Sequence, residues 1–164
     1  MGEIIAGIIG VLAFILTIWI YRQSHRERVS VDVYGGTRTE MHGPALFAKV
    51  CNMGQIPVYL QDVCLACGKD VNTGGDFNID LKMTAVSSLE RPLAVGDLRE
   101  YMLPMVSPNR ELLRSILDKP EAKIWLSVRS GKGEIFRVTG PKIEVLIESL
   151  LKDPGPTAED QEGN

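Results

Sequence analysis

Three cysteines and a histidine are the residues best suited to metal or redox chemistry. Cys64 and Cys67 form a Cys-x-x-Cys pair, and His42 and Cys51 precede it. Zinc is held by four such ligands, whereas a redox pair needs a helix N-terminus to lower the pKa of its first thiol. Because Cys64 ends an apolar, strand-like run, the sequence favours buried, reduced thiols over either activity. A Cys3His zinc site remains conceivable if Cys51 and Cys64 face each other across a hairpin.

The other candidate groups form no constellation that is typical of catalysis. His25 lies among arginines, and Asp62, Asp76 and Asp80 have no partner that the sequence reveals. Residues 131–133, Gly-Lys-Gly, lack the eight-residue phosphate-loop pattern and are predicted to form a turn. We therefore expect a protein that is not an enzyme, with no catalytic or cofactor-binding residues, no cofactor and no bound metal.

The N-terminal segment is the longest apolar run in the chain. The eighteen residues from Ile4 to Tyr21 contain no charged side chain. As a helix they would extend roughly 27 Å, close to the ~30 Å hydrocarbon thickness of a bilayer. Residues 1–21 are therefore predicted to be a transmembrane anchor, with Trp19 and Tyr21 at the headgroup level. A cleaved signal peptide is disfavoured, because the N-terminus lacks basic residues and the run is long.

Basic residues after this run predict its orientation. Arg22, Arg26 and Arg28 lie in a basic juxtamembrane linker, residues 22–28. Arginines beside a membrane span are retained on the cytoplasmic side. We expect a single-pass protein of the inner (plasma) membrane, with the N-terminus outside and the domain in the cytosol. An odd number of cysteines also suits a reducing compartment.

Composition limits the classes of partner. Residues 29–152 contain equal numbers of basic and acidic side chains, which argues against nucleic-acid binding, since that needs a clustered basic surface. A membrane and a protein partner are the expected contacts. Small residues at a four-residue spacing would also allow two N-terminal helices to pack as a homodimer. These residues are Gly2, Ala6 and Gly10.

The remaining chain shows the patterns of a β-rich domain. Val29, Val31 and Val33 alternate with polar residues, which is typical of a half-buried strand. Segments 45–51 and 57–66 are predicted to pair as a hairpin, and a second hairpin is expected around residues 131–133. Asn52 is expected to be a turn residue whose side chain bonds nearby backbone.

Helical patterns appear late in the chain. Ser107 and Pro108 are predicted to start a helix, with the serine as its N-cap. From Pro141 the apolar residues recur with the helical period of 3.6, which indicates an amphipathic helix packed on the sheet. Residues 29–152 are therefore predicted to form a β-sandwich domain with a helical cap, followed by a disordered acidic tail, 153–164.

Two short motifs carry a resemblance to a known group. Residues 50–58 read V-x-N-x-G-x-x-P-V, and residues 92–96 read Pro-Leu-x-x-Gly. With the N-terminal anchor, these features resemble uncharacterised bacterial single-pass membrane-anchored proteins with an immunoglobulin-like β-sandwich domain. The resemblance implies an N-terminal transmembrane helix plus a mainly-β domain, an antiparallel immunoglobulin-like sandwich with a C-terminal amphipathic helix. It implies no site residues.

The sequence thus predicts a location and a shape more sharply than an activity. We expect a membrane-anchored, non-catalytic binding or assembly module on the cytosolic face, which uses sheet edges or loops. Two alternatives remain open at this stage. One is an extracytoplasmic adhesion or assembly module of the cell envelope, and the other is a thiol or zinc enzyme that uses the Cys-x-x-Cys pair.

Overall fold

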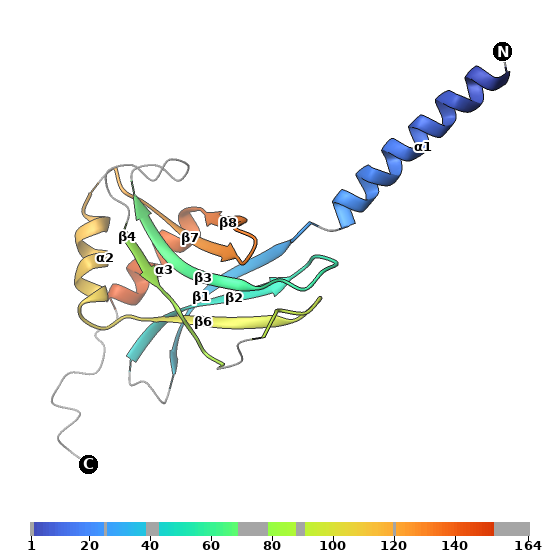
Figure 1. Ribbon diagram of the computed structural model, residues 1–164. Coiled ribbons are helices and arrows are strands. Elements are labelled where there is room, and N and C mark those ends of the chain that lie inside the picture. The colour runs from blue at the N-terminus through green and yellow to red at the C-terminus, as the bar shows by residue number, and fades with distance from the viewer. Residues whose placement is uncertain are drawn as a thin grey trace, which may run out of the picture.

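The computed structural model describes residues 2–24, 26–38, 43–68, 79–87, 91–119 and 121–152. Within them the chain forms three helices and eight strands (Figure 1). In chain order these are α1 (Gly2–Ser24), β1 (Val29–Arg38), β2 (Gly43–Asn52), β3 (Leu60–Gly68), β4 (Ile79–Lys82), β5 (Thr84–Ala85), β6 (Leu98–Pro104), α2 (Asn109–Leu117), β7 (Lys123–Ser130), β8 (Ile135–Thr139) and α3 (Pro141–Lys152).

The strands form two antiparallel sheets. Sheet 1 has the order β1-β2-β6-β5, and sheet 2 has the order β4-β3-β7-β8. In the lettering of immunoglobulin sandwiches these orders correspond to A-B-E-D and C′-C-F-G. The chain changes sheet between β2 and β3, between β4 and β5, and between β6 and β7. The fold is therefore mainly β, with the connections of a sandwich.

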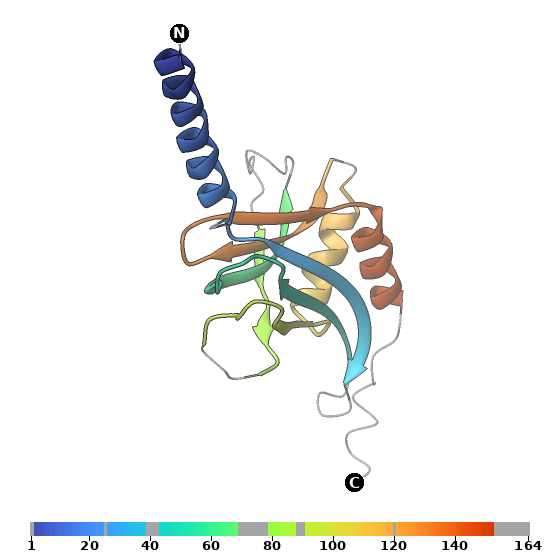
Figure 2. The ribbon, with the colours of Figure 1, turned by 90° about the vertical axis from the view of Figure 1, so that its right-hand side faces the viewer.

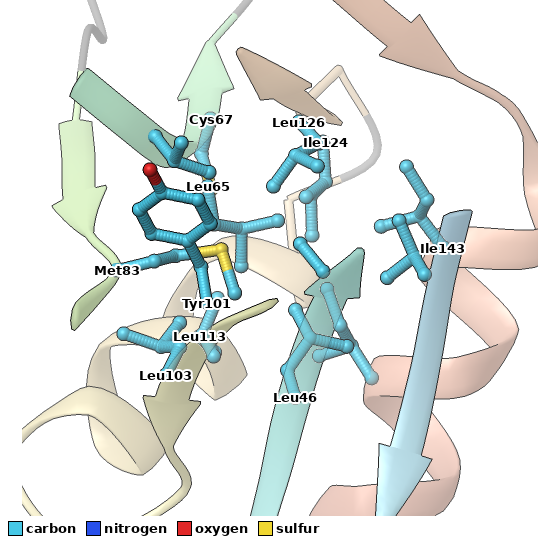
Figure 3. Close-up of a cluster of buried hydrophobic side chains, with 14 of the residues drawn as sticks. Leu46, Leu65, Cys67, Met83, Tyr101, Leu103, Leu113, Ile124, Leu126 and Ile143 are labelled. Carbon is cyan, nitrogen blue, oxygen red and sulfur yellow. The ribbon is translucent and has the colours of Figure 1, made fainter. Parts of the chain in front are cut away.

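The core lies between the sheets, where alternate side chains of each strand point inward. Leu46 of β2, Leu65 of β3 and Leu126 of β7 are all fully buried. Figure 3 shows side chains from both sheets around a common interior, with Tyr101 of β6 and Ile143 of α3 at its margins. Burying each of the leucines contributes about 1.5–3 kcal/mol relative to exposure.

Helix α3 closes one side of the sandwich, as the 3.6-residue pattern predicts. Ile143 and Ile147 are buried, whereas Val145 is exposed on the opposite face. Strand β1 approaches the helix closely at Gly35, because a Cβ there would lie 3.0 Å from Leu150 Cδ2. Figure 2 shows α3 beside the curved strand β1. The predicted C-terminal amphipathic helix is confirmed.

Helix α2 lies at the opposite end of the sandwich from α1 (Figure 1). Its residues Arg110 and Arg114 both donate hydrogen bonds from Nη2 to the carbonyl oxygen of Leu151, at 2.7 and 3.2 Å. The predicted N-cap is wrong. Pro108 occupies the N-cap position, and the hydroxyl of Ser107 donates to the carboxylate of Glu111, because the helix begins one residue later than expected.

The predicted pairing of β2 with β3 is also wrong. Strand β2 pairs with β1 and β6 in sheet 1, whereas β3 pairs with β4 and β7 in sheet 2. The connection 53–59 therefore crosses from one sheet to the other. Both strands show the same apolar pattern whether they pair directly or face each other across a core, so the local sequence does not distinguish these arrangements.

The structure overturns the predicted transmembrane anchor. Among the described residues, no helix combines the length and apolar character needed to cross a bilayer. The same finding contradicts the expected single-pass plasma-membrane location, with its outside N-terminus and cytosolic domain.

Candidate functional site

The ends of six strands meet at one end of the sandwich, where α1 joins the body (Figure 1). Strands β1, β3, β6 and β8 begin there, and β2 and β7 end there. We call this surface the loop end. It comprises the connecting residues 26–28, 53–59, 91–97 and 131–134. In immunoglobulin variable domains, loops grouped at one end of the sandwich form the binding surface.

The buried side chain of Asn52 holds segments of the loop end together. Its side chain is fully buried, and Nδ2 donates to the carbonyl oxygens of Ile56 and Leu93 at 2.8 and 2.9 Å. Its Oδ1 accepts a hydrogen bond from the backbone N–H of Gly54 at 2.9 Å. The prediction that Asn52 is a turn residue that bonds nearby backbone is confirmed. The side chain also joins two segments that lie far apart in sequence.

Backbone hydrogen bonds reinforce this connection. Val58 and Leu93 exchange N–H to carbonyl bonds at 3.0 and 2.7 Å, and the N–H of Gly96 donates to the Asn52 carbonyl at 2.9 Å. The two motifs read from the sequence, 50–58 and 92–96, therefore contact each other. Gly96 has a φ of 79°, a conformation that favours glycine. Both segments are held in fixed positions.

The turn 131–134 is attached to the same framework. The N–H of Gly131 donates to the carbonyl oxygen of Tyr59 at 2.7 Å. A Cβ on Gly131 would lie 3.1 Å from Tyr59 Cβ, so glycine permits this close approach. Gly133 has a φ of 82°, and the prediction that residues 131–133 form a turn is confirmed.

Three exposed apolar side chains lie on the segments of the loop end or directly beside them. Met53, Val95 and Leu98 are 64%, 54% and 56% exposed. Cys51 lies among them, with its Sγ 3.8 Å from Met53 Sδ and 3.9 Å from the Gly96 carbonyl oxygen, and with its Cα paired to that of Leu98. We call Met53, Val95 and Leu98 the apolar patch. It is a candidate contact surface, since apolar groups presented together on fixed loops are typical of binding sites.

A buried carboxylate lies on another side of the loop end. The Glu27 side chain is only 3% exposed, and its Oε1 is 3.9 Å from the Nζ of Lys132. Its Oε2 is also buried and accepts no hydrogen bond from the described residues. Both residues line an open pocket of about 590 Å³, together with Tyr59 and Gln61. No sequence pattern indicates this site, because Glu27 reads as one solvated charge in a basic linker.

The structure separates the three cysteines that the sequence grouped as zinc or redox candidates. Cys51 lies in sheet 1, whereas Cys64 and Cys67 lie in sheet 2. The approach of Cys51 to Cys64 across a hairpin, which the sequence left conceivable, does not occur. Cys64 and Cys67 are three residues apart on one strand, so their side chains point to opposite faces, and only Cys67 reaches the core. His42 lies outside the described residues.

Neither thiol of the Cys-x-x-Cys pair is activated. Burial, followed by the nearby Asp80 carboxylate, raises the pKa of Cys67 to about 12. The pKa of Cys64 is also raised, first by burial and then by Asp80 and Asp62. Both environments favour the neutral thiol over the thiolate that metal binding and nucleophilic attack require. The described residues contain no group of three or more His, Cys, Asp or Glu side chains placed to hold a metal ion.

The remaining predicted residues are dispersed. Asp62 forms an ion pair with Lys82, with Nζ 2.9 Å from Oδ1. Asp76 and His25 lie outside the described residues. Arg26 and Arg28 line a hollow of about 320 Å³ between the end of α1 and the turn at Gly54.

On α1 itself, Trp19, Tyr21 and Arg22 are exposed. The side chains of Ile4 and Ala6 lie outside the described set, as does the environment of Gly2. At Gly10 an added Cβ would meet nothing within 4 Å.

Comparisons with known proteins add little to this geometry. No protein-family model matches the chain, and no curated protein matches it. Among solved structures, a crystal structure named "Putative ApaA Protein from Bordetella pertussis" is similar over 69% of this chain and 88% of that chain. The two share 15% sequence identity, with a TM-score of 0.35. A similarity at this level carries no argument about activity.

Proposed function

We propose that this protein is a non-catalytic binding module that engages a protein partner through the loop end. The observation that carries the proposal is the set of hydrogen bonds made by the Asn52 side chain. These bonds fix the two segments that present the apolar patch. A surface that is already ordered loses little conformational entropy on binding, which favours affinity.

The chemistry of the loop end supports a protein as the partner. Methionine, tyrosine and arginine are enriched at protein interfaces. The loop end presents Met53 and Tyr59, 64% and 62% exposed, and Arg26 and Arg28 line the adjoining hollow. A polar rim around exposed apolar groups is the usual arrangement of such interfaces.

Site-specific photo-crosslinking in cells that produce the full chain tests the proposal. A photoreactive phenylalanine analogue placed at Val95 should form a discrete adduct with another protein. The matched control position is Val106, a valine that is 49% exposed, comparable to the 54% of Val95, and that follows β6 at the opposite end. It should give no adduct of the same mass.

A second substitution makes the test specific to the apolar patch. Met53→Lys should reduce the yield of the Val95 adduct at least about fivefold, because a charged side chain would be buried in the interface. Val145→Lys, on the exposed face of α3, should leave the yield unchanged. The absence of an adduct at Val95, or equal adducts at Val95 and Val106, would contradict the proposal.

A further inference from the structure

One oxygen of the Glu27 carboxylate, Oε2, is buried without a hydrogen-bond donor among the described residues. The side chain of Glu27 as a whole is only 3% exposed. Removing a carboxylate from water without donors costs several kcal/mol, so such groups are normally paired. A ligand that supplies N–H donors and positive charge would remove this cost.

Lys132 is a weak partner for this carboxylate. Its Nζ lies 3.9 Å from Oε1, which is too long for a hydrogen bond, and its side chain is 60% exposed. A solvated ammonium at this distance contributes little to stabilising the buried carboxylate. Its flexible side chain can move aside when a better donor binds. Lys132 lies on the turn 131–134, which the Gly131 to Tyr59 hydrogen bond keeps in place.

The pocket next to the carboxylate favours a planar cation. Tyr59 lines it with an exposed side chain, and Gln61 adds an amide. A guanidinium group can donate two parallel hydrogen bonds to a carboxylate and stack on an aromatic ring, whereas an ammonium group acts as a point charge. The volume of about 590 Å³ falls within the range of ligand pockets.

We infer that this pocket binds an arginine side chain, whose guanidinium replaces the Lys132 ammonium as the partner of Glu27 and stacks on Tyr59. The inference rests on the proposed function, in which the arginine belongs to the protein partner. The pocket then supplies the charged anchor of the interface, and the apolar patch supplies its hydrophobic part.

The test uses a small probe, so that it does not depend on identifying the partner. The ¹⁵N-labelled full chain is titrated with N-acetyl-arginine amide, and then with N-acetyl-citrulline amide, which has nearly the same shape without the charge. We expect saturable shifts of the amide signals of Tyr59, Gly131 and Lys132. The arginine compound should bind at least about tenfold more tightly than the citrulline compound, because only the former is a charged donor.

Variants of the same turn supply the controls. Glu27→Gln should weaken binding of the arginine probe at least about tenfold, while Glu134→Gln, which removes one exposed carboxylate nearby, should change it less than about twofold. Lys132→Met should strengthen binding, because the competing ammonium is gone. Equal binding of the two probes, or equal effects of Glu27→Gln and Glu134→Gln, would overturn the inference.

The outcome stays interpretable if Glu27→Gln does not fold. The comparison of the two probes on the unsubstituted chain and the effect of Lys132→Met both decide without it. The two proposals also fail separately. If the arginine probe does not bind but Val95 still crosslinks, the pocket inference falls and the binding function stands. If the probe binds but no adduct forms at Val95, the reverse holds.

Discussion

At the scale of single residues, Asn52 links the segments 53–59 and 91–97 through three side-chain hydrogen bonds. The amide is fully buried, so water cannot replace these bonds when the side chain is removed. The adjoining Gly54 leaves little room for change, because a Cβ there would lie 3.1 Å from both Asn52 Oδ1 and the Arg28 nitrogen.

We predict that Asn52→Ala lowers the free energy of unfolding by about 2–4 kcal/mol, because two carbonyl oxygens and one N–H lose their buried partner. Urea denaturation of both proteins measures this change. Asn109→Ala is the matched control, since Asn109 makes one part-buried hydrogen bond from Nδ2 to the Pro104 carbonyl. Its effect should be about 1 kcal/mol. A loss below that of the control would refute the role given to Asn52.

Cys67 gives a second prediction at this scale, on the pH dependence of stability. Its folded-state pKa is raised from 9.0 to about 12, so the folded protein holds the thiol proton more tightly than the unfolded chain does. This contribution to stability is fully present below pH 9 and is lost as the pH rises toward 12. Tyr101, whose pKa burial also raises, adds a loss of the same sign.

The free energy of unfolding should therefore fall less steeply at high pH in Cys67→Ala than in the unsubstituted protein. The difference in the free energy of unfolding between the two proteins should shrink by up to about 4 kcal/mol as the thiol ionises in the unfolded state. Urea midpoints measured at intervals from about pH 8 to pH 11 follow most of this change. Parallel curves would show that the buried thiol is not the cause.

At the scale of elements, periodic patterns were sufficient to predict individual segments. The alternation at Val29–Val33 and the 3.6-residue repeat from Pro141 both correspond to observed elements, β1 and α3. These patterns work because one face of each element is buried and the other is solvated. The same patterns did not predict which strands pair, because β2 and β3 contribute to one core from opposite sheets.

The candidate site was predicted only in part, for a similar reason. Asn52 was recognisable because its type and its place after a strand are typical of turns. Glu27 was not, because burial of a charge depends on segments 57–61 and 131–132, which reach it only in the folded chain. The Cys-x-x-Cys spacing alone does not indicate a site, since it acquires a chemical meaning only on a helix or a loop that turns both thiols to one side.

At the scale of the whole molecule, α1 stands apart from the sandwich (Figure 1). Its described side chains are exposed, and the core clusters contain residues of the strands, of α2 and α3, and of nearby connections. The stability of the body should therefore be independent of the helix.

We predict that a chain lacking residues 1–24 unfolds in urea with a free energy within about 0.5 kcal/mol of the full chain, because no core contact among the described residues is lost. Glu27 and β1 are retained in this variant. Circular dichroism should show the loss of helical signal alone. A larger decrease in stability, or loss of a cooperative transition, would mean that α1 supports the body.

The positions of the two ends of the described chain have a mechanical consequence. Helix α1 joins the loop end, whereas α3 finishes beside α2, where Arg110 and Arg114 hold the Leu151 carbonyl. Tension between these points would pull β1 along its own axis, against the full ladder that joins it to β2 over ten residue pairs. Such a force loads the hydrogen bonds between β1 and β2 simultaneously rather than one after another. The body can therefore transmit a tensile force from the loop end to the end at α2.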